Sequence, residues 1–221
     1  MTKPLIAINF KTYNSSTGQN CEHLAKVCDI VAAQEQASII VCVSAPNIYK
    51  LSQALQIPVY AQHVDNITEG AHTGHILASD VALNGAAGTL LNHSERQMPS
   101  AELSEAFVHA KNAQLSTIIC AATLEKAIEV AKLEPEYIAF EPPELIGGDI
   151  SVTTRPEVIT ELVAKIRAIS KTKILVGAGV KTTEDVRLAL QLGCDGVLLA
   201  SGITKSQDPE AALKGLIAGT R

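Results

Sequence analysis

Three residues that can move protons or stabilise negative charge stand at the ends of short apolar runs in this 221-residue sequence. Lys11, His93 and Glu141 each follow or close one of these runs. A carboxylate and an imidazole can exchange protons with a bound molecule, and an ammonium can stabilise charge that develops on an oxygen atom. The set therefore predicts acid–base chemistry that requires no metal ion.

Small residues follow the last two apolar runs. Gly177 and Gly179 come after one run, and Ser201 and Gly202 come after the other. Barrel enzymes commonly bind a phosphate group at the corresponding loops, where bare backbone N–H groups and a helix N-terminus face the ligand. A phosphate site beside acid–base groups predicts a small phosphorylated substrate.

Each of these residues also has a purely structural interpretation. Lys11 can be a solvated charge, His93 can simply precede a helix start, and Gly177 and Gly179 can serve a tight turn alone. Glu141 is harder to explain in this way, because a carboxylate that closes an apolar run is costly to bury unless it is paired or used.

Three histidines are candidate ligands for a metal ion. His72 and His75 are three residues apart, with His63 upstream, in a stretch that contains glycine and threonine. Histidines in such a loop are more often structural, so we expect no metal site here.

Eight short, nearly all-apolar runs predict parallel strands that are buried on both faces. They cover residues 5–9, 38–43, 59–62, 89–92, 117–121, 137–141, 174–177 and 197–200. Amphipathic stretches with helical spacing alternate with several of them. This alternation favours a closed (β/α) barrel over an open doubly wound sheet, whose glycine-rich nucleotide fingerprint is not completed after Gly177 and Gly179.

Local residues indicate where some helices begin. Ser100, Thr123 and Thr183 stand where an N-cap is expected. Pro156 and Pro209 suit a first helical turn, which tolerates proline because its N–H groups have no partner within the helix.

The composition excludes several classes of protein. Hydrophobic residues make up 47% and charged residues 19% of the sequence, and the net charge of −5 disfavours a general nucleic-acid binder. No apolar run approaches the roughly 20 residues that cross a bilayer, and the N-terminus does not resemble a secretory signal. Five cysteines without a Cys-x-x-Cys pair indicate reduced thiols. We therefore expect a cytoplasmic protein with no membrane and no nucleic-acid partner.

Three polar segments together resemble one enzyme family. They are Asn9-Phe10-Lys11, Asn92-His93-Ser94-Glu95-Arg96 and Glu141-Pro142-Pro143-Glu144-Leu145-Ile146-Gly147. In this order, at the ends of predicted strands, they are similar to the triosephosphate isomerases. Segments 61–65 and 198–202 are similar to the short, archaeal-type branch of that family, and the resemblance extends from about residue 5 to about residue 210.

The resemblance implies a (β/α)8 TIM barrel as a single domain over residues 1–221. Because the fold typically has roughly 250 residues, we expect a compact version with shortened helices, which are short or missing around 45–55 and 79–86. The implied reaction is the metal-free interconversion of D-glyceraldehyde 3-phosphate and dihydroxyacetone phosphate through an enediolate, in glycolysis and gluconeogenesis. No cofactor is implied.

The resemblance also implies roles for individual side chains. Glu141 would be the base that moves a proton between two carbon atoms, and His93 would be the neutral electrophile that polarises the carbonyl group. Lys11 would supply fixed positive charge for the phosphate and the enediolate oxygen, and Asn9 would supply a hydrogen bond near the reacting oxygen atoms. Glu95 would support them by pairing with Lys11 or by orienting a loop.

The remaining implied residues bind the substrate or a second subunit. Besides Asn9 and Lys11, the substrate-binding residues would be Ile146, Gly147, Gly179, Ala200 and Ser201, with backbone N–H groups on the phosphate. Segment 142–148 corresponds to the family's mobile lid. The loop that contains His72 and His75 would reach a partner subunit near Lys11, so we expect a homodimer or homotetramer.

Two other interpretations stay open at this point. Another phosphate-binding barrel enzyme would explain the glycines after the last two runs, but not the three polar segments together. A barrel that binds sugar phosphates without catalysis would be expected to lack Lys11, His93 or Glu141, and all three are present.

Overall fold

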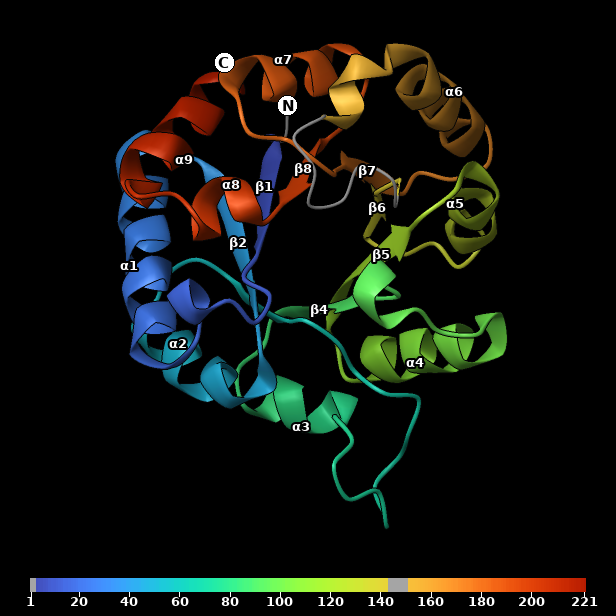
Figure 1. Ribbon diagram of the computed structural model, residues 1–221. Coiled ribbons are helices and arrows are strands. Elements are labelled where there is room, and N and C mark those ends of the chain that lie inside the picture. The colour runs from blue at the N-terminus through green and yellow to red at the C-terminus, as the bar shows by residue number, and fades with distance from the viewer. Residues whose placement is uncertain (1–2, 143–150) are drawn as a thin grey trace.

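The computed structural model describes residues 3–142 and 151–221, in which eight parallel strands close into a barrel (Figure 1). Each strand pairs with the next along the chain, and the last pairs with the first. The strands are β1 (Leu5–Asn9), β2 (Ser38–Val43), β3 (Val59–Ala61), β4 (Gly88–Leu91), β5 (Ser116–Ala121), β6 (Tyr137–Phe140), β7 (Lys173–Val176) and β8 (Gly196–Leu199). The predicted closed barrel is confirmed, because each predicted run matches one strand.

Strand residues are buried on both faces, as the apolar runs predict. One face packs inside the barrel, where Ala7, Cys42, Cys120 and Leu198 belong to a single cluster. The alternate residues, such as Ile8, join a larger cluster that includes the inner faces of the helices. Successive side chains of a strand point to opposite faces, so a strand between two apolar layers needs apolar residues at every position.

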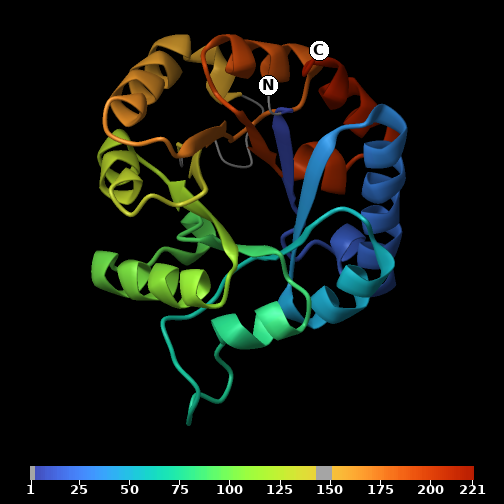
Figure 2. The same ribbon diagram turned by 180° about the vertical axis from the view of Figure 1, so that it is seen from behind.

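Helices surround the barrel, and the view from behind shows the same ring (Figure 2). The α-helices are α1 (Gly18–Glu35), α2 (Ile48–Ala54), α3 (Ala78–Leu83), α4 (Ser100–Asn112), α5 (Leu124–Ala131), α6 (Pro156–Arg167), α7 (Thr183–Gln191), α8 (Ser201–Thr204) and α9 (Pro209–Ala218). Short 3-10 turns are η1 (Asn14–Ser16), η2 (Ala45–Asn47), η3 (Ser94–Arg96) and η5 (Val152–Thr154). The helices expected to be short are α2 and α3, and both are present with fewer than eight residues.

One of the three predicted N-caps is correct. The Thr123 side chain accepts a hydrogen bond from the backbone of Lys126 at the start of α5. Ser100 is instead the first residue of α4, after Pro99. Thr182, not Thr183, caps α7, because its hydroxyl oxygen accepts from the Asp185 backbone N–H while the Asp185 carboxylate accepts from the Thr182 backbone N–H.

The segment between β3 and α3 projects away from the barrel (Figures 1 and 2). Residues 68–75 are all exposed, whereas Asp65 at its base is buried. The Asp65 backbone donates to the carbonyl of Ile76 over 2.8 Å, and the Ile76 backbone donates to the Asp65 carboxylate over 2.7 Å. Arg96 and His63 contact the same carboxylate. The Asp65 carboxylate therefore joins the two ends of this projecting loop and connects them to Arg96 and His63.

Residues 3–142 and 151–221 contain neither a membrane-spanning helix nor a metal-binding cluster. No helix there has the length and hydropathy to span a membrane. No group of histidine, cysteine and acidic side chains there is arranged to hold a metal ion, and His72 and His75 contact each other edge to face. All five cysteines are buried free thiols, as the sequence predicts.

Candidate active site

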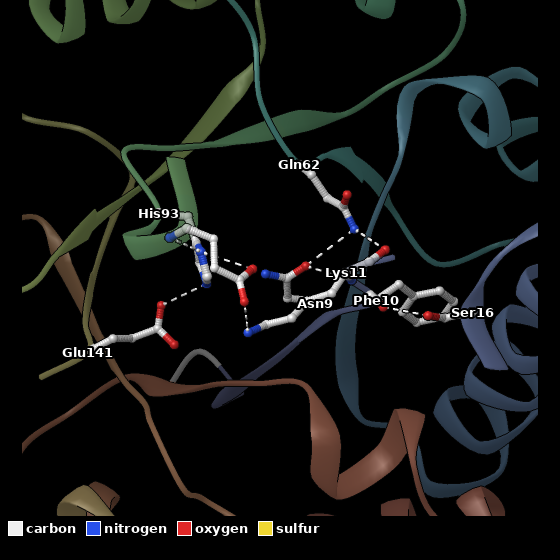
Figure 3. A network of polar contacts seen from close by, with 8 residues as sticks. Asn9, Phe10, Lys11, Ser16, Gln62, His93 and Glu141 are labelled. Atoms are coloured by element: carbon white, nitrogen blue, oxygen red, sulfur yellow. Dashed lines mark hydrogen bonds and ion pairs between the residues drawn. The ribbon is translucent and has the colours of Figure 1, made fainter. Parts of the chain in front are cut away.

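The predicted catalytic side chains meet at the carboxyl ends of the strands, around one cavity (Figure 3). Asn9 and Lys11 come from the end of β1, His93 from the segment after β4, and Glu141 from the end of β6. Because all eight strands are parallel, their carboxyl ends lie at the same end of the barrel. The closed topology therefore gathers residues that are as much as 132 positions apart in the printed sequence, from Asn9 to Glu141.

Glu141 is a buried carboxylate with one oxygen that is available for chemistry. Only 7% of the residue is exposed, and within the described ranges its Oε2 atom has no hydrogen-bond partner. Burial raises the pKa of Glu141 to about 7, although the nearby Lys11 charge opposes the shift. A carboxylate whose pKa is near neutral can both take and return a proton at physiological pH.

The thiol of Cys120 lies beside Glu141 in the barrel interior. It forms a hydrogen bond with the Glu141 carboxyl group. Burial and the charge of Glu141 raise the pKa of Cys120 well above its usual value, so the group stays a thiol and donates the hydrogen bond. Cys120 was not predicted as a site residue, because a cysteine within an apolar run has no feature that separates it from an ordinary buried thiol.

His93 is held as a neutral imidazole. Its Nδ1 atom accepts a hydrogen bond from the Glu95 backbone N–H over 3.2 Å, as the N-cap of η3. An accepting nitrogen carries no proton, so the hydrogen of the neutral ring lies on Nε2. Burial and the Lys11 charge lower the pKa of His93, and Glu95 opposes them. The Nε2 atom lies 3.6 Å from Oε2 of Glu141.

Lys11 has an unusual backbone conformation that its neighbours hold in place. Its φ angle is +51°, a left-handed value that is unfavourable for a side chain other than glycine. The Lys11 N–H donates to Oδ1 of Asn9 over 3.0 Å, and Nε2 of Gln62 donates to the Lys11 carbonyl over 3.0 Å. Gln62 also lies 3.3 Å from Oδ1 of Asn9. Gln62 thus fixes both predicted residues, a role that its position at a strand end did not reveal.

The Lys11 ammonium is paired with the predicted supporting residue. Nζ lies 2.8 Å from Oε1 of Glu95. Glu95 therefore contacts Lys11 through its side chain and His93 through its backbone. This arrangement confirms the expected pairing and links the two segments that carry these charges.

The opposite wall of the cavity contains the small residues predicted to hold a phosphate. Gly179, Ala200 and Ser201 line the same cavity as Glu141 and His93. Gly179 has a φ angle of +74°, a conformation that favours glycine. Ile146 and Gly147, the two other predicted phosphate contacts, lie outside the described residues.

Comparison with known proteins agrees with this geometry. A sequence model of the family described as "Triosephosphate isomerase" matches residues 4–217. The chain belongs to the triosephosphate isomerase family. The match covers all eight strands and every predicted site residue, so the resemblance found in the three polar segments extends to the whole barrel.

Several full-length relatives in this family come from archaea. The triosephosphate isomerase of Methanosarcina acetivorans is 43% identical over 221 residues, which cover 98% of this chain and 99% of the relative. That of Methanocaldococcus jannaschii is 44% identical, over 96% of this chain and 98% of its own length. That of Sulfurisphaera tokodaii is 43% identical, over 98% and 95%. These similarities place the chain with the short, archaeal-type triosephosphate isomerases, as predicted.

Membership in the triosephosphate isomerase family establishes the reaction. The chain is an aldose–ketose isomerase that interconverts D-glyceraldehyde 3-phosphate and dihydroxyacetone phosphate, a step of glycolysis and gluconeogenesis. The two other interpretations of the sequence, a different phosphate-binding enzyme and a non-catalytic sugar-phosphate binder, are thereby set aside.

Gly177 allows the Glu141 carboxylate to lie where it does. A Cβ atom at residue 177 would be 2.5 Å from the Leu198 carbonyl oxygen and 2.9 Å from Oε1 of Glu141. We expect Gly177→Ala to displace the carboxylate and lower kcat/KM by about 100-fold, the order of loss that follows a misplacement of roughly 1 Å. Steady-state kinetics would measure the change.

A glycine far from the cavity is the matched control. A Cβ atom at Gly215 in α9 would approach no atom closer than 4.0 Å. Gly215→Ala should leave kcat/KM near the wild-type value and stabilise the helix by roughly 0.5–1 kcal/mol. If Gly177→Ala and Gly215→Ala had the same kcat/KM, the claim that Gly177 sets the position of the Glu141 carboxylate would be wrong.

Burial of Glu141 also predicts a pH-dependent cost in stability. A carboxyl group whose pKa rises from 4.5 to about 7 on folding binds its proton more tightly in the folded state. Its charge therefore destabilises the fold above about pH 7, and this penalty fades as the pH falls toward 4.5. We expect Glu141→Gln to raise the free energy of unfolding at about pH 8 and to change it much less at about pH 5. Urea unfolding at both pH values measures this. If burial did not destabilise the carboxylate, the free energies of unfolding of wild type and Glu141→Gln would differ by the same amount at both pH values.

Proposed function

We propose that Glu141 and His93 carry the isomerisation through an enediolate, with Lys11 and Asn9 as the other catalytic residues. The observation that supports this most strongly is the buried Oε2 atom of Glu141, which has no hydrogen-bond partner among the described residues and lies 3.6 Å from Nε2 of His93. A buried acceptor of this kind is costly unless a bound molecule provides its partner.

The proton transfers follow from this arrangement. The Glu141 carboxylate takes the proton from the carbon next to the carbonyl group, and the electron pair of the broken C–H bond moves toward the carbonyl oxygen. His93 Nε2–H donates to that oxygen, and the neutral ring is a suitable donor because its other nitrogen is already an acceptor. His93 passes its Nε2 proton to that oxygen and takes up the proton of the neighbouring hydroxyl group, so the ring ends in its starting state. Glu141 returns its proton to the carbon of the original carbonyl group, and the neighbouring carbon becomes the new carbonyl carbon.

Lys11 and Asn9 stabilise the charge that develops. The Lys11 ammonium provides fixed positive charge for the enediolate oxygen, and its hydrogen-bonded backbone holds it without reorganisation during the reaction. Asn9 provides a polar side chain near the same atoms. Gly179, Ala200 and Ser201 bind the phosphate through backbone N–H groups, together with Ile146 and Gly147.

The test of this function is a coupled assay. Purified protein is mixed with D-glyceraldehyde 3-phosphate, and the dihydroxyacetone phosphate formed is reduced by glycerol-3-phosphate dehydrogenase with NADH. We expect NADH consumption that depends on the protein and is lost in Glu141→Gln. Absence of NADH consumption at high enzyme concentration would contradict the assignment.

We further propose that the chain acts in the cytoplasm as one domain over residues 1–221 and as a homodimer or homotetramer. A second cavity of about 360 Å³ adjoins the first and shares Asn9, Lys11 and His93 with it. The exposed tip of the projecting loop, residues 68–75, is a suitable occupant from a second copy. Such docking would cover one side of Lys11.

Light scattering tests the oligomeric state. We expect a mass of two or four times 23.3 kDa at the concentrations used for kinetics. Deletion of residues 69–74 should give a smaller species with reduced kcat/KM. A fully active species of 23.3 kDa would contradict self-association through this loop.

A further inference from the structure

Tyr13 is part of the cavity wall, although the sequence did not suggest a role for it. It lines the same cavity as Glu141, Gly179 and Ser201. Its carbonyl oxygen accepts hydrogen bonds from the Ser16 backbone over 2.9 Å and from the Ser16 hydroxyl over 3.2 Å. Because Ser16 is buried, the turn after β1 that carries Tyr13 is held against the body of the barrel.

Lys205 lies over the ring of Tyr13. Its Nζ atom is 4.5 Å from the ring centroid, within the distance of a cation–π contact. The Lys205 backbone donates to the carbonyl of Ser201 over 3.1 Å, so α8 has Ser201 at its first residue and Lys205 directly after its last. Lys205 itself does not line the cavity, but the ring that its ammonium group contacts does, and the short helix that ends just before Lys205 begins at Ser201 in the cavity wall.

The charge balance around the cavity favours such a cation. Glu141 and Glu95 bring two carboxylates, and the Lys11 ammonium is already paired with Glu95. A phosphate that carries close to two negative charges has to enter this site. In the part of the chain that the structure describes, Lys205 has no carboxylate partner, so its charge is available to an incoming anion.

We propose that Lys205, positioned by the Tyr13 ring, is a binding residue for the phosphate group of the substrate. It adds positive charge beside the wall formed by Gly179 and Ser201, and the contact with the ring limits where the exposed lysine side chain can lie. The inference rests on the proposed placement of the phosphate at this wall. It assigns a second positive charge to the site, in addition to the Lys11 ammonium that is paired with Glu95.

The test compares two lysines that both lie over aromatic rings. Lys205→Gln removes the proposed charge. Lys111→Gln is the matched control, because Lys111 lies 6.0 Å from the centroid of the Phe107 ring on the outer helix α4. The probe is glycerol 3-phosphate, which carries the phosphate but cannot isomerise, and calorimetry measures its affinity for each full-length variant.

We expect Lys205→Gln to weaken binding of glycerol 3-phosphate about threefold to tenfold at low ionic strength. This is the order of effect of one solvent-exposed lysine charge on a phosphate dianion. The difference should shrink as salt is added, because screening reduces the interaction. Lys205→Arg should restore most of the affinity, and Tyr13→Leu should reproduce part of the loss. Lys111→Gln should bind like the wild type.

Kinetics separate a phosphate contribution from a general structural one. With D-glyceraldehyde 3-phosphate the loss in Lys205→Gln should appear in KM rather than in kcat. With glyceraldehyde, which lacks the phosphate, kcat/KM should not differ between wild type and variant. An equal loss with both substrates, or unchanged affinity for glycerol 3-phosphate at low salt, would overturn the proposal.

The calorimetric result is independent of the proposed catalytic roles. If the wild type binds glycerol 3-phosphate more tightly than Lys205→Gln but does not isomerise, the catalytic assignment fails and Lys205 keeps its role. If the wild type isomerises and the two proteins bind equally, only the Lys205 proposal fails. A wild type that does not bind glycerol 3-phosphate would overturn both.

Discussion

Glu141→Asp should lower kcat by about 100-fold or more and leave the affinity for glycerol 3-phosphate nearly unchanged. Aspartate keeps the charge but is one methylene shorter, so the carboxylate withdraws from the reacting carbon. The loss should be large because Glu141 is fixed from several sides: the Cys120 thiol forms a hydrogen bond with its carboxyl group, and Gly177 packs against it. These neighbours leave little freedom for a shorter side chain to recover the lost reach. Steady-state kinetics and calorimetry together measure the two effects.

A glutamate beside the other end of the same strand provides the control. Glu136 directly precedes β6 and is paired with Lys173 on the protein surface. Glu136→Asp makes the same chemical change outside the cavity and should leave kcat near the wild-type value. Full turnover by Glu141→Asp would remove Glu141 from the role of base. A matching loss in both variants would indicate a general effect of shortening a glutamate.

His93→Gln should also lower kcat by about 100-fold or more, the typical contribution of a well-placed acid–base group. Glutamine can still donate a hydrogen bond from its amide group, but it cannot transfer a proton between oxygen atoms. The hydrogen bond from the Glu95 backbone to Nδ1 would also be lost or rearranged. Because Glu95 pairs with Lys11, some increase in KM should accompany the fall in kcat.

His23→Gln is the matched control for this second prediction. His23 lies on the exposed face of α1, and its replacement should change neither kcat nor KM. If His93→Gln kept wild-type turnover, polarisation of the carbonyl group would have to come from Lys11 and Asn9 alone. That result would contradict the role given to the neutral imidazole.

The barrel could be predicted from local sequence because its strands are buried on both faces. Runs such as Leu5–Asn9 and Ser38–Val43 are nearly continuous in apolar residues, and their ends coincide with the observed strands. The N-caps were less reliable, since Thr182 and Thr183 are chemically equivalent. Only the position of Asp185 three residues after Thr182 decides between them.

The predicted catalytic residues share a simple signal, which is a polar side chain at the carboxyl end of an apolar run. Gln62, Cys120 and Tyr13 were missed as contributors for a different reason. Their contacts depend on which strands and loops become neighbours when the barrel closes. Gln62 reaches the Lys11 carbonyl across 51 positions of sequence, and Tyr13 meets Lys205 from the other end of the chain. No local pattern contains that information.

The central claim is that Glu141 moves a proton between two carbon atoms, and isotope exchange tests it most directly. The reaction is run from D-glyceraldehyde 3-phosphate in D2O, and NMR measures deuterium in the new C–H bond of dihydroxyacetone phosphate. A proton held on Glu141 can exchange with solvent before it is returned, so we predict substantial deuterium in the product of the wild type and no conversion by Glu141→Gln. Product that retains all of its original hydrogen, or deuterated product formed at the wild-type rate by Glu141→Gln, would contradict the account.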